Sequence, residues 1–175
     1  MKMEINSPLS EKKVKDLSLG QKVEVSGDIL TARDKAHQRI LNQFDLPFEL
    51  DNQIIYHCGP LVSEEKENYK IISAGPTTST RLSEFIPQIL EKHEIRAFIG
   101  KGGLKKEAIE SLKNNNCLYL SYTGGAGALA AKSIKRVKDV FWLDLGIPEA
   151  VWKLEIERLP CIVSIDTDGQ TLYHV

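Results

Sequence analysis

The sequence predicts an α/β layered domain, and three of its features support this prediction. From residue 69 onward, short apolar strands, glycine-rich loops and helices follow one another in that order, which is typical of α/β layers. A β-rich segment precedes this region, and further strands are expected near the end of the sequence. The 175 residues fit a single domain over residues 1–175, long enough to bury roughly two-thirds of the unfolded surface in one core.

The first expected strand follows a lead-in. Residues 1–20 form this lead-in, which ends at Gly20. Residues 22–26 alternate polar and apolar side chains, and this pattern predicts a half-buried strand. Gly27 is expected to bend that strand.

A helix is expected next, from Thr31 to about residue 44. Thr31 and Asp34 have the spacing of a capping box, and Pro47 ends the helical pattern. A strand over residues 53–56 follows. The apolar side chains expected on the buried face of the helix recur every four residues: Ala36, Ile40 and Phe44.

Three glycine-rich loops dominate the middle of the chain. The charged residues 63–68 before them are expected to form a solvated turn. Pro87 predicts either two short helices after Thr80 or one kinked helix. The loops are residues 75–78, 100–103 and 124–127, and the strands that feed them are expected at 69–74, 97–99 and 117–120.

The last part of the chain is expected to return to strands. Residues 140–143 and 161–165 are apolar and rich in strand-forming side chains. A turn at Asp168 and Gly169 is expected to lead into a last strand at 171–173.

Composition excludes several classes of protein. The formal net charge of −1 argues against a nucleic-acid-binding protein, which usually carries a strong basic excess. No stretch approaches the ~18 apolar residues that a membrane span requires. The first six residues lack the apolar region of a signal peptide, so a cytoplasmic location is expected.

The three cysteines do not resemble a disulfide framework or a cluster-binding motif. Cys58, Cys117 and Cys161 are odd in number and widely spaced. Cys117 and Cys161 fall within apolar runs, where cysteine is commonly a small buried residue. No metal site is therefore expected within this chain.

The glycine loops are candidate anion-binding sites. A loop between the end of a strand and the start of a helix exposes backbone N–H groups under a positive helix dipole. Three such loops suggest one shared anionic ligand. The alternative is that the glycines only make tight turns.

Three cations are candidates for binding such an anion, and two of them lie where stability does not favour a positive charge. Arg33 falls in the first turn of its expected helix, and Lys101 lies inside a glycine loop. Arg81 follows a run of hydroxyl side chains that includes Thr77 and Thr78. Arginine forks and a lysine ammonium would match the two carboxylates of a small diacid. The alternative is three unrelated surface cations.

One histidine shares this neighbourhood. His37 lies four residues after Arg33 and therefore on the same helix face. This placement suggests a role in proton transfer or substrate orientation, although most lone helical histidines are structural. His57, His93 and His174 have no such neighbours in the sequence.

A nucleotide site is the main alternative from another class. Gly125 and Gly127, with Ala130, match a dinucleotide fingerprint after an expected strand, and Asp144 lies about twenty residues further on. The motif comes late in the chain, however, and leaves the two earlier loops unexplained. A P-loop is disfavoured because Gly102 follows Lys101 where Ser or Thr is required.

Six motifs occur in a fixed order along nearly the whole chain. They are residues 31–37 (TARDKAH), 56–60 (YHCGP), 75–81 (GPTTSTR), 100–103 (GKGG), 124–126 (GGA) and 145–149 (LGIPE). In this order they resemble the β subunit of the two-subunit class I fumarases and L-tartrate dehydratases.

The resemblance implies a fold, a partner and a cofactor. The fold is a swivelling β/β/α domain, equivalent to the C-terminal domain of single-chain class I fumarases. The partner is an α subunit in an α2β2 assembly, and its three cysteines hold a 4Fe-4S cluster that acts as a Lewis acid on the departing hydroxyl. This chain would bind no cofactor itself.

The resemblance also implies roles for residues at matching positions. Arg33, Arg81 and Lys101 would bind substrate carboxylates, together with Thr78. Thr77 would be the base that removes the C3 proton, which requires strong local cations because threonine is a poor base. His37 would serve in acid–base chemistry or positioning.

The expected function is the reversible hydration of fumarate to (S)-malate. Tartrate dehydration is the nearest alternative. A nucleotide-binding or regulatory module using Gly125 and Gly127, and a free-standing carboxylate-binding domain, are the alternatives outside this enzyme class.

Overall fold

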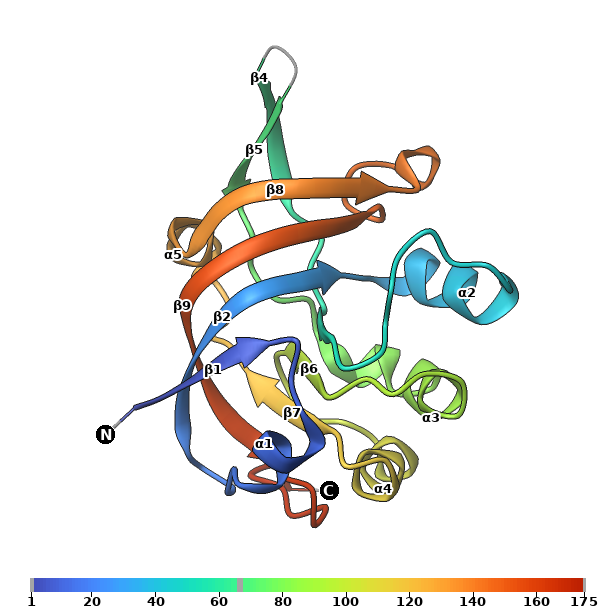
Figure 1. Cartoon of the computed structure of the whole chain (residues 1–175), viewed down its shortest axis with the longest axis vertical. Helices are drawn as coiled ribbons and strands as arrows, with labels where there is room; N and C mark the ends of the chain where they lie inside the picture. Colours follow the sequence, from blue (N-terminus) through green and yellow to red (C-terminus); the bar gives the residue numbers. More distant parts are fainter. Residues whose placement is uncertain (1, 66–67, 175) are drawn as a thin grey trace.

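The computed structural model describes residues 2–65 and 68–174 and has a mixed α/β architecture (Figure 1). A seven-stranded sheet has the order β1-β2-β3-β6-β7-β9-β8, and β4 and β5 form a separate hairpin. The strands are β1 (Met3–Ser7), β2 (Lys22–Thr31), β3 (Ile54–Tyr56), β4 (Leu61–Glu65), β5 (Asn68–Ser73), β6 (Ala97–Gly100), β7 (Leu118–Ser121), β8 (Ile134–Phe141) and β9 (Val151–Ile165).

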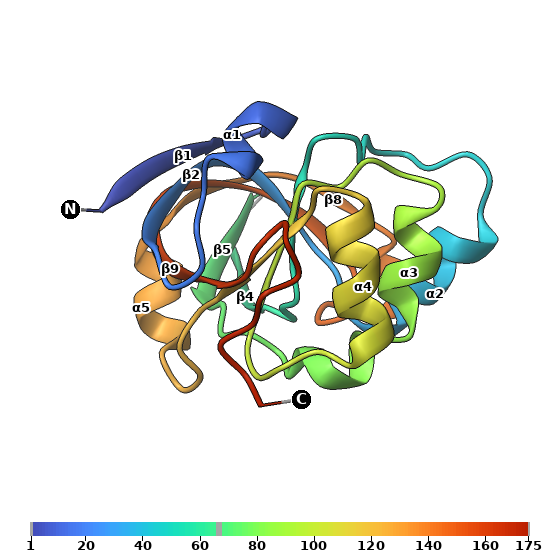
Figure 2. The ribbon, with the colours of Figure 1, turned by 90° about the horizontal axis from the view of Figure 1, so that it is seen from below.

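Helices lie on both sides of the sheet. The helices α2, α3 and α4 stack along one side, and α5 lies on the other (Figures 1 and 2). The helices are α1 (Glu11–Lys15), α2 (Asp34–Asn42), α3 (Phe85–Leu90), α4 (Lys106–Asn114) and α5 (Gly127–Lys132), with 3-10 turns η1 (Ser79–Leu82) and η2 (Leu143–Leu145).

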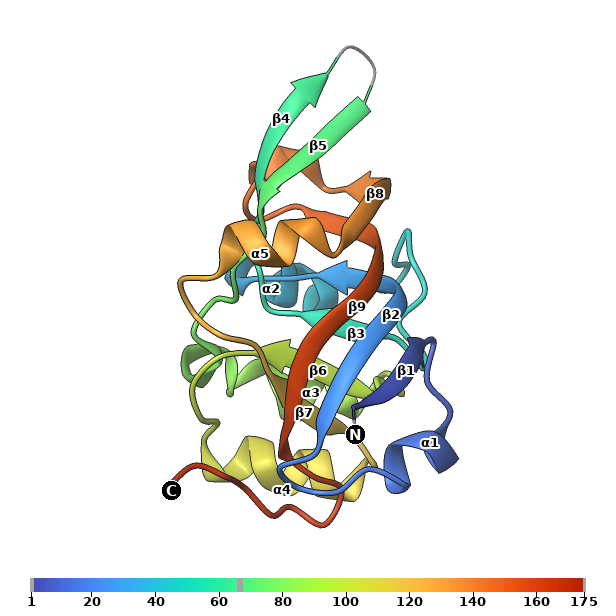
Figure 3. The same ribbon diagram turned by 90° about the vertical axis from the view of Figure 1, so that its left-hand side faces the viewer.

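Strand β9 closes the sheet into a ring. The strands β1, β2, β3, β6 and β7 are parallel to one another. Strand β9 runs antiparallel to both β2 and β7, so β2, β3, β6, β7 and β9 are paired in a closed circuit. Figure 3 shows β9 crossing the molecule beside β2, with the β4–β5 hairpin projecting beyond the body.

The central parallel strands β3, β6 and β7 are apolar on both faces because both faces are covered. On β3, Ile54 and Tyr56 belong to one core cluster and Ile55 to the other, as the alternation of side chains along a strand requires. Phe98 and Tyr119 join Ile55 under the helices α2, α3 and α4. The strands expected from continuous apolar runs at 53–56, 97–99 and 117–120 are thereby confirmed within a residue or two.

The N-terminal lead-in has more structure than expected. Residues 1–20 contain β1 and α1, and β1 extends the sheet by pairing with β2. Ser10 caps α1, its hydroxyl accepting a hydrogen bond from the Lys13 backbone N–H at 3.3 Å. Gly27 has φ +95° at a register shift between β2 and β9, which confirms a local irregularity there.

The expected capping box at Thr31 is wrong. Thr31 is the last residue of β2, and its hydroxyl accepts a hydrogen bond from the Trp152 backbone N–H at 3.1 Å. Helix α2 begins at Asp34, and Phe44 lies beyond its end and is 100% exposed. The other two side chains of the expected buried face, Ala36 and Ile40, are buried.

The hairpin and the final strands also differ from expectation. The expected strand at 69–74 exists as β5, but it pairs with β4 and not with the main sheet. The expected turn at 63–68 is partly β4, and residues 66–67 lie outside the described residues. Strands β8 and β9 are longer than expected because β8 pairs along its length with the first part of β9, and β9 continues by pairing with β2 and β7. Beyond β9, Thr171 forms only an isolated bridge with Ile165.

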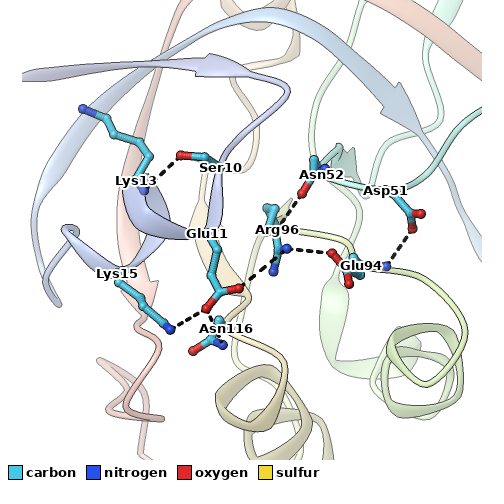
Figure 4. A network of polar contacts seen from close by, with 9 residues as sticks. All are labelled: Ser10, Glu11, Lys13, Lys15, Asp51, Asn52, Glu94, Arg96 and Asn116. Atoms are coloured by element: carbon cyan, nitrogen blue, oxygen red, sulfur yellow. Dashed lines mark hydrogen bonds and ion pairs between the residues drawn. The ribbon is translucent and has the colours of Figure 1, made fainter.

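A buried arginine joins several elements at the start of β6, away from the ends of the strands where the glycine loops lie. Arg96 is 7% exposed and donates to Asn52 Oδ1 at 3.0 Å and to Glu94 Oε2 at 2.8 Å (Figure 4). Glu11 of α1 lies 4.0 Å from the same guanidinium. Arg96 therefore links the N-terminal segment to the central strands.

We predict that Arg96→Met lowers the free energy of unfolding by about 2 kcal/mol, because it removes hydrogen bonds to charged and polar partners from a largely buried site. Urea denaturation measures this change. Arg136→Met is the matched control, since the exposed Arg136 pairs with Glu155 and should contribute under about 1 kcal/mol. Equal losses in the two variants would contradict the prediction.

Candidate functional site

The carboxyl ends of four parallel strands form one edge of the sheet. Arg33 lies two residues after β2, and Gly59 lies three residues after β3. Lys101 directly follows β6, and the loop containing Gly124 follows β7. Because β2, β3, β6 and β7 are parallel neighbours, these residues gather along the same edge, where ligands of such sheets commonly bind.

The hydroxyl-rich segment lies across this edge. The Thr77 backbone N–H donates to His57 O at 2.7 Å, and the Ser79 N–H donates to Lys101 O at 2.9 Å. Thr78 and Lys101 form a parallel bridge. Thr77 is half-buried and Thr78 is exposed. The backbone contacts thus place both threonines beside Lys101 at the ends of β3 and β6.

The three glycine loops meet, as a shared site requires. The Ala74 N–H donates to Gly127 O at 3.0 Å, which joins the first loop to the third. A Cβ built on Gly124 would lie 3.2 Å from Lys101 Cδ, so the Lys101 side chain passes over the third loop. A Cβ on Gly100 would lie 1.8 Å from the Oγ of Ser79, the residue after the first loop, so glycine at 100 allows the second loop to lie close to this segment.

The Arg33 guanidinium lies between the backbone of Gly59 and the Glu149 carboxylate. A Cβ on Gly59 would lie 2.6 Å from Arg33 Nη1. Arg33 Nε is 3.7 Å from Glu149 Oε1, an ion pair too long for a hydrogen bond. Among the residues the structure describes, this buried nitrogen has no hydrogen-bond partner. The Arg33 side chain as a whole is 28% exposed, so its guanidinium charge is available to an anionic ligand.

Arg81 is held beside Arg33 by Asp34, the residue that follows Arg33 in the chain. Arg81 Nε donates to Asp34 Oδ1 at 3.0 Å, and Nη2 donates to Oδ2 at 2.9 Å. These hydrogen bonds hold the pKa of Asp34 below its ordinary value. The pair therefore fixes the Arg81 guanidinium close to the start of α2.

His37 and His57 form a buried pair under the site. Both are 0% exposed, and their ring centroids are 5.1 Å apart. His37 Nδ1 contacts Arg33 O at 2.7 Å, and His57 Nδ1 contacts Ser79 Oγ at 2.8 Å. Burial lowers the pKa of His37 to about 4, and burial with the nearby His37 and Arg81 lowers that of His57 well below its ordinary value. Both rings are therefore neutral near pH 7.

The sequence interpretation missed His57 and Glu149 as site residues. His57 had no charged neighbour in the sequence, yet the fold places it against His37 and Ser79. Glu149 contacts Arg33 from 116 positions along the chain. His57 lies in the second of the six ordered motifs and Glu149 in the sixth, and their place in these motifs was the only sequence signal for them.

The donor groups of this chain do not fit an iron-sulfur cluster. Within the described residues, no three His, Cys, Asp or Glu side chains are grouped to hold a metal ion. Cys58, Cys117 and Cys161 are free and buried. Burial raises the pKa of Cys58 to about 12 and also raises those of Cys117 and Cys161, which disfavours the thiolates that ligate iron.

The third glycine loop has a packing role. A Cβ on Gly127 would lie 2.2 Å from Ser73 Oγ and 3.0 Å from Gly75 N. Asp144, the acidic residue that a dinucleotide site would use, instead pairs with Arg39 of α2 through contacts of 2.9 and 2.6 Å. These features favour tight packing over nucleotide binding.

The chain belongs to the fumarase C-terminus family, whose model matches residues 1–175. It is 42% identical to the "Putative L(+)-tartrate dehydratase subunit beta" of Methanocaldococcus jannaschii over 94% of this chain and 88% of that protein. It is 30% identical to the L(+)-tartrate dehydratase subunit beta of Escherichia coli over 98% of this chain and 87% of that protein. It is also 37% identical to a "Putative fumarate hydratase class I" of Geobacillus stearothermophilus, over 97% of this chain and 33% of that protein.

These relatives are named as hydro-lyases, so the resemblance found in the six motifs is confirmed at the level of the family. Their names do not separate fumarate from tartrate. Among the residues described, no helix is both long and apolar enough to cross a membrane.

If Arg33 binds a substrate carboxylate, as the resemblance implies, Gly59→Ala is expected to weaken diacid binding about tenfold. Its Cβ would lie 2.5 Å from Arg33 Cδ and 2.7 Å from Pro148 O, and the side chain of Arg33 can move more readily than the backbone. Displacing one cationic donor costs about 1.5 kcal/mol, which corresponds to about tenfold. The measurement is the KM of the assembled enzyme, with circular dichroism as the control for folding. An unchanged KM in a folded variant would contradict the assignment of Arg33.

Proposed function

We propose that this chain is the β subunit of an iron-sulfur hydro-lyase that reversibly hydrates fumarate to (S)-malate. The observation that carries the proposal is the gathering of Arg33, Arg81, Lys101 and Thr77 around one edge of the sheet. Three cations beside a row of hydroxyl groups suit a substrate with two carboxylates and a proton to be removed.

The substrate-binding roles follow from the charges of the side chains. Arg33, whose side chain is partly exposed, and Arg81, with a guanidinium edge not used by Asp34, would bind carboxylates. Lys101 supplies an ammonium group and Thr78 an exposed hydroxyl beside them.

Thr77 is the proposed base for the C3 proton. Its hydroxyl requires a lowered pKa for this role, and the nearby Lys101 and Arg81 cations favour the charged form of the oxygen. The neutral, buried His37 contacts the Arg33 backbone and is better suited to positioning than to donating a proton near pH 7.

The partner and cofactor complete the proposal. Relatives named as β subunits support an α subunit as partner, and we propose that the α subunit carries the 4Fe-4S cluster in an α2β2 assembly. Residues 1–175 would act as a single swivelling β/β/α domain in the cytoplasm. This chain would supply carboxylate binding and proton transfer.

L-tartrate dehydration is the second candidate, favoured by two relatives of similar length that carry that name. The test is a comparison of kcat/KM for fumarate, malate and L-tartrate with the anaerobically assembled complex. A preference for fumarate and malate supports the proposal, and a preference for tartrate selects the second candidate. Stabilisation of the chain by a nicotinamide cofactor in a thermal shift, without turnover of any diacid, would replace both.

A further inference from the structure

Each arginine of the proposed diacid site is accompanied by a carboxylate of the chain itself. Asp34 pairs with Arg81, and Glu149 pairs with Arg33. Neither carboxylate has a place in the proposed proton transfer. Two carboxylates beside an anion-binding site repel its ligand. Their presence there therefore requires a favourable contribution to substrate binding that offsets the repulsion.

Asp34 engages only one edge of the Arg81 guanidinium. Its two oxygens accept from Nε and Nη2, and Nη1 takes no part in this pair. An arginine side chain carries about 2 kcal/mol of rotamer entropy, much of which is lost when one edge is fixed. A substrate carboxylate that meets the remaining edge then binds an already oriented donor.

Glu149 acts on the start of helix α2. Arg33 is the N-cap residue and makes no side-chain capping bond within the described chain, so the exposed N–H groups of the first turn need another acceptor. Glu149 Oε2 accepts from the Lys35 N–H at 3.0 Å. Its other oxygen lies 3.7 Å from Arg33 Nε. The Glu149 carboxylate therefore contacts both the first turn of α2 and the guanidinium of Arg33, its N-cap residue.

We propose that Asp34 and Glu149 are positioning residues that orient Arg81 and Arg33 for the two carboxylates of the substrate. The inference rests on the proposed function. It differs from a competitive role, in which the same carboxylates would occupy the arginines and weaken substrate binding. The two roles predict opposite changes in affinity when the charge is removed.

The experiment compares Asp34→Asn and Glu149→Gln in the anaerobically assembled complex. Asp144→Asn is the matched control. Asp144 holds Arg39 of α2 through two contacts, but Arg39 lies in the last turn of this helix, away from the site. The measurements are the KM for the diacid, kcat, and the Ki of succinate, a saturated diacid that cannot react. Each site variant is expected to raise KM and Ki about tenfold and to leave kcat within about threefold, as loss of orientation at one arginine implies.

A second variant separates positioning from a general loss of structure. Combining Asp34→Asn with Arg81→Lys should add little to the loss caused by Arg81→Lys alone, because Asp34 acts through Arg81. If Asp34→Asn does not assemble, Asp34→Glu keeps the charge and should give an intermediate Ki.

The outcomes distinguish the inference from the function on which it rests. If the wild-type complex turns over a diacid but the site variants match Asp144→Asn, or bind succinate more tightly, the inference is overturned and the proposed function stands. If a wild-type complex with an intact cluster turns over no hydroxy-diacid, both are overturned.

Discussion

Thr77→Ala is expected to lower kcat by about a thousandfold or more while the complex still assembles. The variant removes the hydroxyl oxygen that would accept the C3 proton, and a positioned general base contributes about 10²- to 10⁴-fold. The backbone bond from Thr77 N–H to His57 O does not depend on the side chain, so the local fold should persist. Anaerobic turnover with a determination of cluster content measures the change.

Two further variants control for the position of Thr77. Thr77→Ser retains a hydroxyl and should recover much of the activity. Thr80→Ala removes a neighbouring hydroxyl that donates to Gly103 O at 2.7 Å, and it should change kcat only slightly. Retention of most activity by Thr77→Ala would show that another group is the base.

Arg81→Lys is expected to lower kcat/KM by about tenfold to a hundredfold. An ammonium group cannot hold Asp34 through two donors and also present a planar edge to a substrate carboxylate. Hydrogen bonds to charged groups contribute about 1.5–3 kcal/mol, which corresponds to this range. Because the Arg81 side chain is 45% exposed, solvent screening makes the lower part of the range the more reasonable expectation.

The control for Arg81 is Arg39→Lys. Arg39 has the same kind of two-point contact with Asp144, and it lies in the last turn of α2, away from the glycine loops. Its replacement should leave kcat/KM within about twofold. Equal effects of the two substitutions would mean that Arg81 contributes to folding and not to substrate binding.

The central strands and the cations of the site could be predicted because their signals are local. Strands β3, β6 and β7 are buried on both faces and therefore appear as continuous apolar runs. Arg33 and Lys101 stood out because each occupies a position that helix or turn stability does not explain. The second and third loops meet because they follow the parallel strands β6 and β7, which end at one edge. The first loop follows β5 of the hairpin, and its contact with Lys101 could not be predicted from strand order.

The remaining features depend on contacts between distant parts of the chain. Thr31 has the composition of a cap, but its partner is the Trp152 backbone on β9. The pairing of β1 with β2 and the closure by β9 join segments whose local patterns do not identify their neighbours. His57 lacks charged neighbours in sequence, and only the fold places it against His37. Local periodicity carries no information on such contacts.

The most direct test of the half-site proposal is a titration of the purified, cluster-loaded α subunit with this chain under anaerobic conditions. Fumarate turnover is followed by the absorbance of the unsaturated acid. We predict no turnover by either subunit alone and activity that rises with added chain to a plateau at one chain per α subunit. Full turnover by the α subunit alone, or a complex with an intact cluster that is inactive towards both fumarate and L-tartrate, would contradict the proposal that this chain supplies half of the active site.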